Sequence, residues 1–368
     1  MIKYPDYDRS ILSLASSVLK HFGVTDCKHK SLPEFDELLN KNYKNVIVML
    51  FDGMGSSVIE EHLSKNDFLR KHHITDISSV YPSTTVAAVT AIESGYSPLE
   101  TGWIGWDLYF DEIGENVAAF KNTLQKNGEP AAKYNIPLKY IPYKRIFQRI
   151  EDVCGKKTAY YVSVFSKYRS KSVHHICKTV RRLSKRRKHK YIYTYWHKPD
   201  NTMHIYGVHS AEAKNEVQMI NREIESLCKK LKNSLIIITA DHGQVDCVNK
   251  YLEDYPILTD MLKVPPSVEP RALSFFVKDG KVEAFKEEFN KVFGDSFRLM
   301  TKEEVFSENL LGFGNAHRKT TDFIGDFFAV ATGNVMLNIK RSDFEAIGGH
   351  AGLLKKEMTV PFIAIEVK

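Results

Sequence analysis

Short apolar runs alternate with polar stretches of helical periodicity along most of the chain. Four runs have the length and composition of buried strands, and each ends at a turn, a polar cluster or the chain end: 45–51, 191–196, 235–240 and 361–367. Helical patterns cover residues 56–72, 84–93, 210–232 and 282–293. This alternation predicts an α/β, doubly wound, mainly parallel sheet with helices on both faces. Ligands bind such sheets beyond the carboxyl ends of the strands.

Two stretches fit the alternation less well. Residues from about 111 to 190 are richer in Lys, Arg and Tyr, and we interpret them as a cap-like insertion. Residues from about 263 to 321 begin with Pro265-Pro266, contain the strand-like run Ala272–Val277 and are interpreted as a smaller subdomain. No repeat or low-complexity linker separates them. We therefore expect a single α/β domain over residues 1–368 that contains both segments.

Composition excludes several classes of protein. Hydrophobic residues make up 43% of the chain and charged residues 26%, which excludes a disordered, collagen-like or disulfide-dense chain. Apolar runs are too short to cross a membrane, and the amino terminus does not resemble a signal peptide, so no membrane partner is expected. The five cysteines are odd in number and form no CxxC motif, which predicts free thiols and a cytoplasmic location. The net charge of +7 is a mild bias toward anionic partners and does not by itself indicate nucleic-acid binding.

Carboxylates and imidazoles gather where the predicted strands end. Asp200 and His204 lie four residues apart on a helical stretch, so they share one face and can reach one cation. Taken singly, such residues also serve as helix caps or solvated side chains. Together they provide two divalent-metal sites with mixed nitrogen and oxygen ligands, which suit zinc and could clamp both oxygens of a phosphoryl transfer. The set comprises Asp52, Thr85, Asp200, His204, Asp241, His242 and His350.

A hydroxyl cluster supplies a candidate nucleophile. After Pro82, three hydroxyl residues open a helix, and one of them could simply cap it: Ser83, Thr84 and Thr85. A threonine in the first turn also places its oxygen at the positive end of the helix dipole, where a phosphate would be held. Thr85 is therefore the candidate metal-activated nucleophile, and Thr84 is the alternative.

These segments are similar to the alkaline phosphatase superfamily, and within it to the type I phosphodiesterase/nucleotide pyrophosphatase branch. The order and spacing agree over roughly residues 45–368. The segments that carry the resemblance are 52–55, 81–102, 198–204, 240–243, 349–353 and 357–361. Each motif is weak alone, but their combination is specific.

The resemblance implies a role for each residue of the cluster. Asp52, Thr85, Asp241 and His242 would hold one metal, and Asp200, His204 and His350 the other. Two divalent ions are implied, with Zn²⁺ favoured and Mn²⁺ as the alternative. Thr85 would attack phosphorus in line and form a phospho-threonine, which water would then release.

Departures from the branch bear on the substrate. The asparagine usual about 21 residues after the nucleophile is replaced by Trp106, and Asn122 is a candidate substitute. Trp103 and Trp106 could stack on a nucleobase or simply pack in the core. The Thr85 segment lacks both the arginine of monoesterases and the cysteine of sulfatases, which favours diesters.

The predicted reaction is therefore hydrolysis of phosphodiester or nucleotide pyrophosphate bonds. A phosphomonoesterase, a phosphonate hydrolase or a phosphomutase could use the same metal site. In a further alternative, catalysis is lost and the chain binds a nucleotide or nucleic acid. The basic run Arg181–Lys190 either forms the solvated face of a helix or attracts an anionic substrate. We expect a small phosphate ester or nucleotide as partner rather than nucleic acid, and the oligomeric state is left open.

Overall fold

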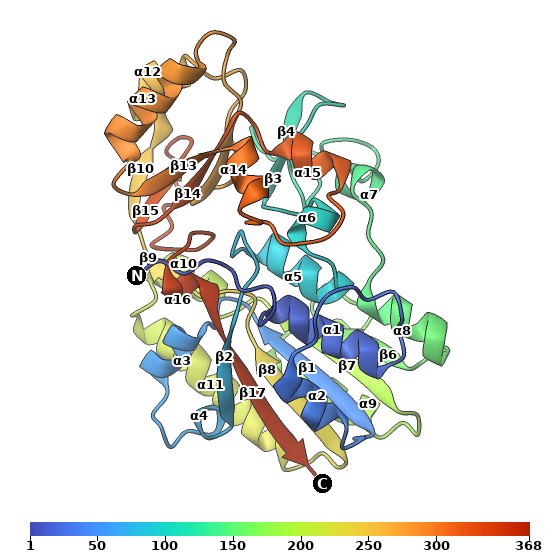
Figure 1. Ribbon diagram of the computed structural model, residues 1–368. Coiled ribbons are helices and arrows are strands. Elements are labelled where there is room, and N and C mark those ends of the chain that lie inside the picture. Colours follow the sequence, from blue (N-terminus) through green and yellow to red (C-terminus); the bar gives the residue numbers. More distant parts are fainter.

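The computed structural model describes residues 1–368 and contains two large β-sheets, each with its own helices, and two sheets of two strands (Figure 1). The larger sheet has six strands in the order β2-β17-β8-β1-β7-β6. Its centre is parallel, and β17 is antiparallel to both of its neighbours. The six strands are β1 (Asn45–Phe51), β2 (His73–Ser78), β6 (Ala159–Val162), β7 (Lys190–Trp196), β8 (Ser234–Thr239) and β17 (Thr359–Val367).

Helices cover both faces of this sheet, so every residue of β1, β7 and β8 is buried. One group of helices is centred on α1 (Ile11–His21), which contacts α2 (Pro33–Leu39), α5 (Thr85–Ser94) and α8 (Ile146–Cys154). The second comprises α3 (Ser56–His62), α4 (Phe68–Lys71), α9 (Val173–Ser184), α10 (Asp200–Tyr206) and α11 (Ala211–Cys228). A strand buried on both faces needs a continuous apolar run, and for this reason these strands could be predicted from the sequence. The predicted α/β class is confirmed.

A seven-stranded antiparallel sheet forms a smaller lobe beyond one end of the larger sheet (Figure 1). Its order is β13-β14-β12-β11-β3-β4-β5, and it has hydrophobic cores of its own. The strands are β3 (Asp107–Phe110), β4 (Glu115–Ala118), β5 (Thr123–Leu124), β11 (Ser267–Glu269), β12 (Ala272–Phe275), β13 (Phe297–Thr301) and β14 (Phe327–Ala331). Its helices are α6 (Pro98–Thr101), α7 (Ile136–Tyr140), α12 (Pro256–Thr259), α13 (Val282–Phe293), α14 (Lys302–Ser307) and α15 (Arg318–Phe323).

Short elements connect the two lobes. β9 (Val245–Asp246), which follows β8 closely, pairs with β16 (Gly348–Gly349) and so draws the loop around His350 toward the end of β8. The other short elements are β10 (Val248–Tyr251), which pairs with β15 (Val335–Asn338), the 3₁₀ turn η1 (Leu252–Asp254) and α16 (Lys355–Met358). Residues of β15 and η1 pack in a core of the smaller lobe.

The structure differs from the sequence-based expectation in two segments. The helical pattern over 56–72 is split, because Leu63 is extended and Asp67 then accepts a hydrogen bond from the Ser64 amide in a turn. Residues 111–190 do not form one cap-like insertion: they contribute β4 and β5 to the smaller lobe and α8, β6 and α9 to the larger. The residues of the expected subdomain 263–321 likewise belong to the seven-stranded sheet and its helices.

All five cysteines are free. None of the helices combines the length and the apolar character needed to cross a membrane.

Candidate functional site

The carboxyl ends of three neighbouring strands bring the predicted acidic residues together. Asp52 directly follows β1, Asp241 follows β8 by two residues, and Asp200 begins α10 after β7. Because β8, β1 and β7 are adjacent and parallel, these ends meet at one edge of the sheet. A backbone hydrogen bond of 2.9 Å from the Asp200 amide to the Asp52 carbonyl fixes two of the turns to each other.

Thr85 lies within hydrogen-bond reach of two predicted metal ligands. Its Oγ1 is 3.3 Å from Asp52 Oδ1 and 3.3 Å from His242 Nε2. The same His242 nitrogen is 3.4 Å from Asp52 Oδ1 and 3.6 Å from Asp241 Oδ2. Ligand atoms of Asp52, Asp241 and His242 all lie within 4.8 Å of one another, a spacing that one cation could bridge.

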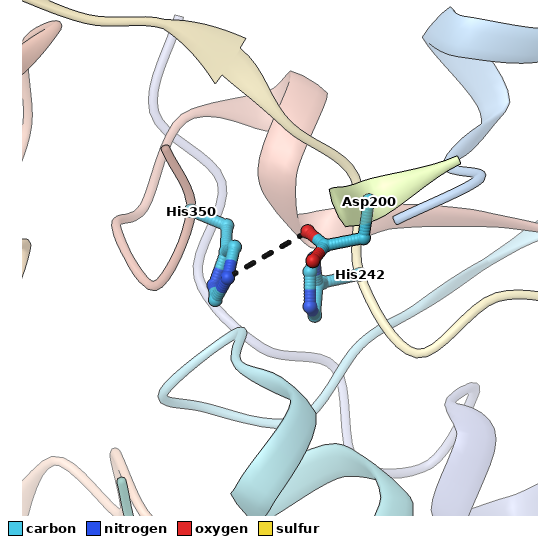
Figure 2. Close-up of side chains that lie close together, drawn as sticks. All are labelled: Asp200, His242 and His350. Carbon is cyan, nitrogen blue, oxygen red and sulfur yellow. Dashed lines mark ion pairs between the residues drawn. The ribbon is translucent and has the colours of Figure 1, made fainter. Parts of the chain in front are cut away.

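A second group of residues lies directly beside the first. Asp200 Oδ1 is 3.3 Å from His204 Nε2 and 3.8 Å from His350 Nε2. Figure 2 shows Asp200 and His350 facing each other, with His242 alongside. The rings of His242 and His350 stack with centroids 3.9 Å apart, so His242 belongs to both groups. The structure therefore brings together all seven residues of the set predicted from the sequence.

Backbone carbonyls orient two of the imidazoles. His204 Nδ1 lies 2.7 Å from the Gly348 carbonyl oxygen, and His242 Nδ1 lies 2.9 Å from that of Gly243. Each ring therefore donates through Nδ1 and presents Nε2 as the free ligand nitrogen, as is usual for metal-binding histidines. Gly243 has no room for a side chain, since a Cβ there would lie 1.9 Å from the Lys356 carbonyl oxygen.

The electrostatics of the cluster favour a bound cation. Burial and the neighbouring Asp241 and Asp200 raise the pKa of Asp52 well above its ordinary value, and burial raises the pKa of Asp241 to about 7. Burial alone would raise the pKa of Asp200, but His204, His350 and His242 outweigh it and lower that pKa. Asp200 Oδ1 and Asp241 Oδ2 are buried without a hydrogen bond. Buried acceptors of this kind fit a divalent metal, which would supply the missing partner.

Three hydroxyls at the start of α5 have distinct surroundings. Ser83 Oγ donates to the Gly352 carbonyl at 2.9 Å, and Thr84 Oγ1 donates to Glu269 Oε1 at 2.6 Å. Both side chains are buried, whereas Thr85 is partly exposed and turns its hydroxyl toward the ligands. No side chain caps α5, so its first amides stay free to bind an anion.

Residues 46–338 match the family model for type I phosphodiesterase/nucleotide pyrophosphatase. The chain belongs to this family. Membership confirms the resemblance that the motifs carry, and with it the predicted class of enzyme, a metal-dependent phosphodiesterase or nucleotide pyrophosphatase-like hydrolase. No curated protein sequence matches the chain.

Solved structures share the fold of this phosphodiesterase-family chain. Murine ectonucleotide pyrophosphatase/phosphodiesterase 5, an inactive variant in complex with AMP, is 17% identical with a TM-score of 0.63 over 87% of each chain. Its human counterpart is 16% identical, with a TM-score of 0.64 over 87% of each chain. Phosphonoacetate hydrolase from Sinorhizobium meliloti 1021 in complex with phosphonoacetate is 19% identical, with a TM-score of 0.64 over 88% of this chain and 90% of that one. At these identities the likeness establishes an alkaline-phosphatase-like fold.

The three residues predicted to contact substrate, Trp103, Trp106 and Asn122, lie in different environments. Trp103 is buried, and its Nε1 donates to the Ile141 carbonyl at 2.7 Å within the smaller lobe. Asn122 uses its side chain to hold a turn, since Oδ1 accepts from the Ile136 amide and Nδ2 donates to the Tyr134 carbonyl. Trp106 is partly exposed, and its backbone amide donates to Glu269 at 2.9 Å. Of the three, Trp106 alone shares a hydrogen-bond partner with the hydroxyl cluster.

Sequence reasoning missed two polar residues at the site. Tyr195 lies within the apolar strand β7, and its hydroxyl donates a short hydrogen bond to Asp52 Oδ2. Glu269 joins Thr84 Oγ1 to the amide of Trp106, and burial raises its pKa to about 7. A tyrosine within a buried apolar run gives no sign in the sequence that its hydroxyl forms a hydrogen bond to a site residue. For Glu269 the only signal was an acid directly before Pro270 in a strand-like segment.

Proposed function

We propose that the protein hydrolyses phosphodiester or nucleotide pyrophosphate bonds through a covalent phospho-threonine at Thr85. The observation that carries this proposal is the position of the Thr85 hydroxyl, 3.3 Å from both Asp52 and His242. The alternative nucleophile, Thr84, is buried and already donates its hydroxyl to Glu269. Thr85 is therefore the hydroxyl that can reach a phosphorus atom held beside the cluster.

Two divalent ions fit the ligand set. Asp52, Thr85, Asp241 and His242 would hold one ion, and Asp200, His204 and His350 the other. The mixture of carboxylates and imidazoles favours Zn²⁺, with Mn²⁺ as the alternative. When bound, such ions activate the hydroxyl and neutralise charge on the phosphoryl oxygens.

The chain's own groups would then organise the displacement. Thr85 Oγ1 forms a bond to phosphorus while the bond from phosphorus to the leaving oxygen breaks, and water later cleaves the Thr85 ester. The uncapped start of α5 directs free amides and the positive end of the helix dipole toward the phosphate. Tyr195 holds the Asp52 carboxylate in place through its hydrogen bond.

Several features favour a diester over a monoester. The first helical turn after Thr85 is apolar, with Val86, Ala87 and Ala88, and offers no arginine to pair with a dianionic phosphate. The relative that carries AMP supports a nucleotide as one half of the substrate. The relative that carries phosphonoacetate makes phosphonates the alternative that an assay should include.

Hydrolysis assays with matched variants test this proposal. We expect bis(p-nitrophenyl) phosphate to be hydrolysed faster than p-nitrophenyl phosphate, and Thr85→Ala to lose at least about a thousandfold in kcat. Thr84→Val is the matched control: it removes the neighbouring hydroxyl and its hydrogen bond to Glu269, and should lose only about tenfold in kcat. Acid quenching during turnover, followed by peptide mass analysis, should find phosphate on Thr85.

Metal analysis tests the two-ion assignment separately. The protein as purified should contain about two equivalents of metal, and His350→Ala about one. Full activity in Thr85→Ala, or preference for the monoester or phosphonoacetate, would overturn the diesterase proposal. We also propose a cytoplasmic location, for which the five free cysteines are the support.

A further inference from the structure

Positive charge is concentrated in one stretch of the chain. Residues 144–190 contain sixteen lysines and arginines but only two carboxylates, Glu151 and Asp152. This stretch therefore has a formal charge of +14, whereas the whole chain has +7. The other residues are net acidic, so the positive charge is a local feature of the molecule.

This basic stretch folds around one edge of the larger sheet. β6 is the edge strand, and both α8 and α9 contact it (Figure 1). Lys188 Nζ donates to the Lys156 carbonyl at 2.9 Å, and an Arg186 guanidinium nitrogen donates to the Tyr160 hydroxyl at 3.3 Å. The basic end of α9 therefore lies at the start of β6, next to further cations.

A cavity of about 620 Å³ follows this edge and is called here the β6 cleft. Its cations alternate with aromatic rings. The Arg186 guanidinium lies 5.4 Å from the Tyr160 ring centroid, and that of Arg145 lies 5.9 Å from the Tyr161 ring centroid. Lys157 and Lys167 complete the cationic lining. The only carboxylate in the lining is Glu151, which pairs with Lys156 at 3.4 Å.

We propose that the β6 cleft binds single-stranded nucleic acid. Cationic side chains match the repeating negative charge of a phosphate backbone, and the exposed ring of Phe165 in the same lining offers a face for an unpaired base. A recessed cavity with rings in its wall suits a flexible strand better than a flat lipid surface. The sequence showed the basic run Arg181–Lys190, but not that Arg186 lies with Lys157 and Lys167 in the lining of one cleft.

The lining of the cleft contacts a residue of the candidate active site. Phe165, in its lining just beyond β6, is 75% exposed, and its ring centroid lies 6.4 Å from that of Tyr195. Tyr195 in turn donates its hydroxyl to Asp52. The Phe165 end of the cleft is therefore separated from the candidate ligand Asp52 by the buried side chain of Tyr195. That a bound strand is presented for cleavage rests on the proposed function, whereas binding itself does not.

Fluorescence anisotropy with a labelled oligothymidylate of about 15 nucleotides tests the proposal. The Thr85→Ala protein is used so that the probe stays intact. In this background, Lys157→Gln, Lys167→Gln and Arg186→Gln are combined in a cleft variant. The matched control combines Lys65→Gln, Lys232→Gln and Lys286→Gln, which remove the same charge from exposed positions elsewhere.

The cleft variant should bind at least about tenfold more weakly at about 0.1 M salt, and the control should bind almost as tightly as its parent. The slope of log affinity against log salt should fall by about 2 in the cleft variant, since each lost phosphate contact contributes about 0.7. Equal weakening in the control would overturn the proposal, because it would trace binding to net charge alone.

Binding measurements with other anionic ligands show which kind of partner the cleft prefers. Inorganic polyphosphate that binds as tightly as the oligonucleotide would overturn the assignment, because the bases would then contribute nothing. If the protein bound phosphatidylserine vesicles through the same three side chains and did not bind the oligonucleotide, the partner would be a membrane and the proposal would be wrong. Hydrolysis of bis(p-nitrophenyl) phosphate by the cleft variant with Thr85 restored should be unchanged. The binding assay therefore tests the β6 cleft, and the hydrolysis assay separately tests the catalytic proposal.

Discussion

Removal of the Arg271 side chain is the sharpest test of how the two lobes fix the His350 loop. Arg271 and Glu357 are fully buried and form a bidentate ion pair, with Nε to Oε1 at 2.9 Å and Nη2 to Oε2 at 2.7 Å. The guanidinium also donates to the carbonyls of Val335 and Gly333 at 2.7 and 2.9 Å. Glu357 in turn accepts from the Gly352 amide at 2.8 Å, two residues beyond His350. The pair therefore ties β12 of the smaller lobe to the loop that carries this ligand.

Arg271→Met should destabilise the protein strongly. The substitution leaves the Glu357 carboxylate buried without its partner charge, a situation that costs about 3–5 kcal/mol. For a chain of 368 residues we expect the thermal midpoint to fall by roughly 4–6 °C. Arg341→Met is the matched control: Arg341 pairs with Glu253 and Asp254 but is more than half exposed, so its loss should cost less than about 1 kcal/mol.

The double variant Arg271→Met/Glu357→Gln separates the buried charge from the lost hydrogen bonds. It should recover at least about 1 kcal/mol relative to Arg271→Met alone, because the unpaired carboxylate is gone. Thermal denaturation is measured with and without chelator, so that loss of metal is distinguished from loss of the fold. A midpoint for Arg271→Met within about 2 °C of the wild type would refute the reasoning, as would a double variant no more stable than the single one.

Three further predictions concern single side chains around the site. Tyr195→Phe should lower kcat/KM about tenfold, because Asp52 loses the hydroxyl that orients it, and metal titration should show weaker binding. Glu269→Ala should lower kcat at least about tenfold, whereas Glu269→Gln, which can still accept from Thr84, should keep most of it. Burial raises the pKa of Glu93 to about 7, so the folded protein keeps this carboxyl protonated at pH values where the unfolded chain has lost the proton. The folded state therefore becomes less stable as the pH rises toward 7. The thermal midpoint of the wild type relative to Glu93→Gln should be higher at about pH 5 than at about pH 8.

The larger sheet was predictable because its signal is local. Each central strand is buried along its whole length, so it must be a continuous apolar run. The clustering of the candidate ligands was predictable for the same reason, since Asp52, Asp200 and Asp241 follow those runs closely. Local signals also placed α13 correctly over 282–293.

The smaller lobe was not predictable because its strands are short and their partners are distant in sequence. β11 has three residues and pairs with β3 only through Val268 and Asp107, more than 150 residues earlier in the chain. No local pattern specifies such a contact. The roles of Tyr195 and Glu269 depend on the same kind of information, because each acts through a residue that only the fold brings near.

The smaller lobe also contacts Thr84, the residue before the candidate nucleophile, and the backbone of the lobe is strained there. Val268 is β-branched yet has φ +80°, a conformation that costs energy and persists only when its surroundings enforce it. Val268 can lie here only because residue 105 is a glycine: a Cβ at Gly105 would be 2.4 Å from Val268 Cγ1 and would clash with it. The next residue, Glu269, joins the Trp106 amide to Thr84, directly before the candidate nucleophile. Because none of these residues belongs to the proposed ligand set, we expect changes in this lobe to shift the candidate nucleophile and the surroundings of Trp106 while the candidate metal ligands stay in place.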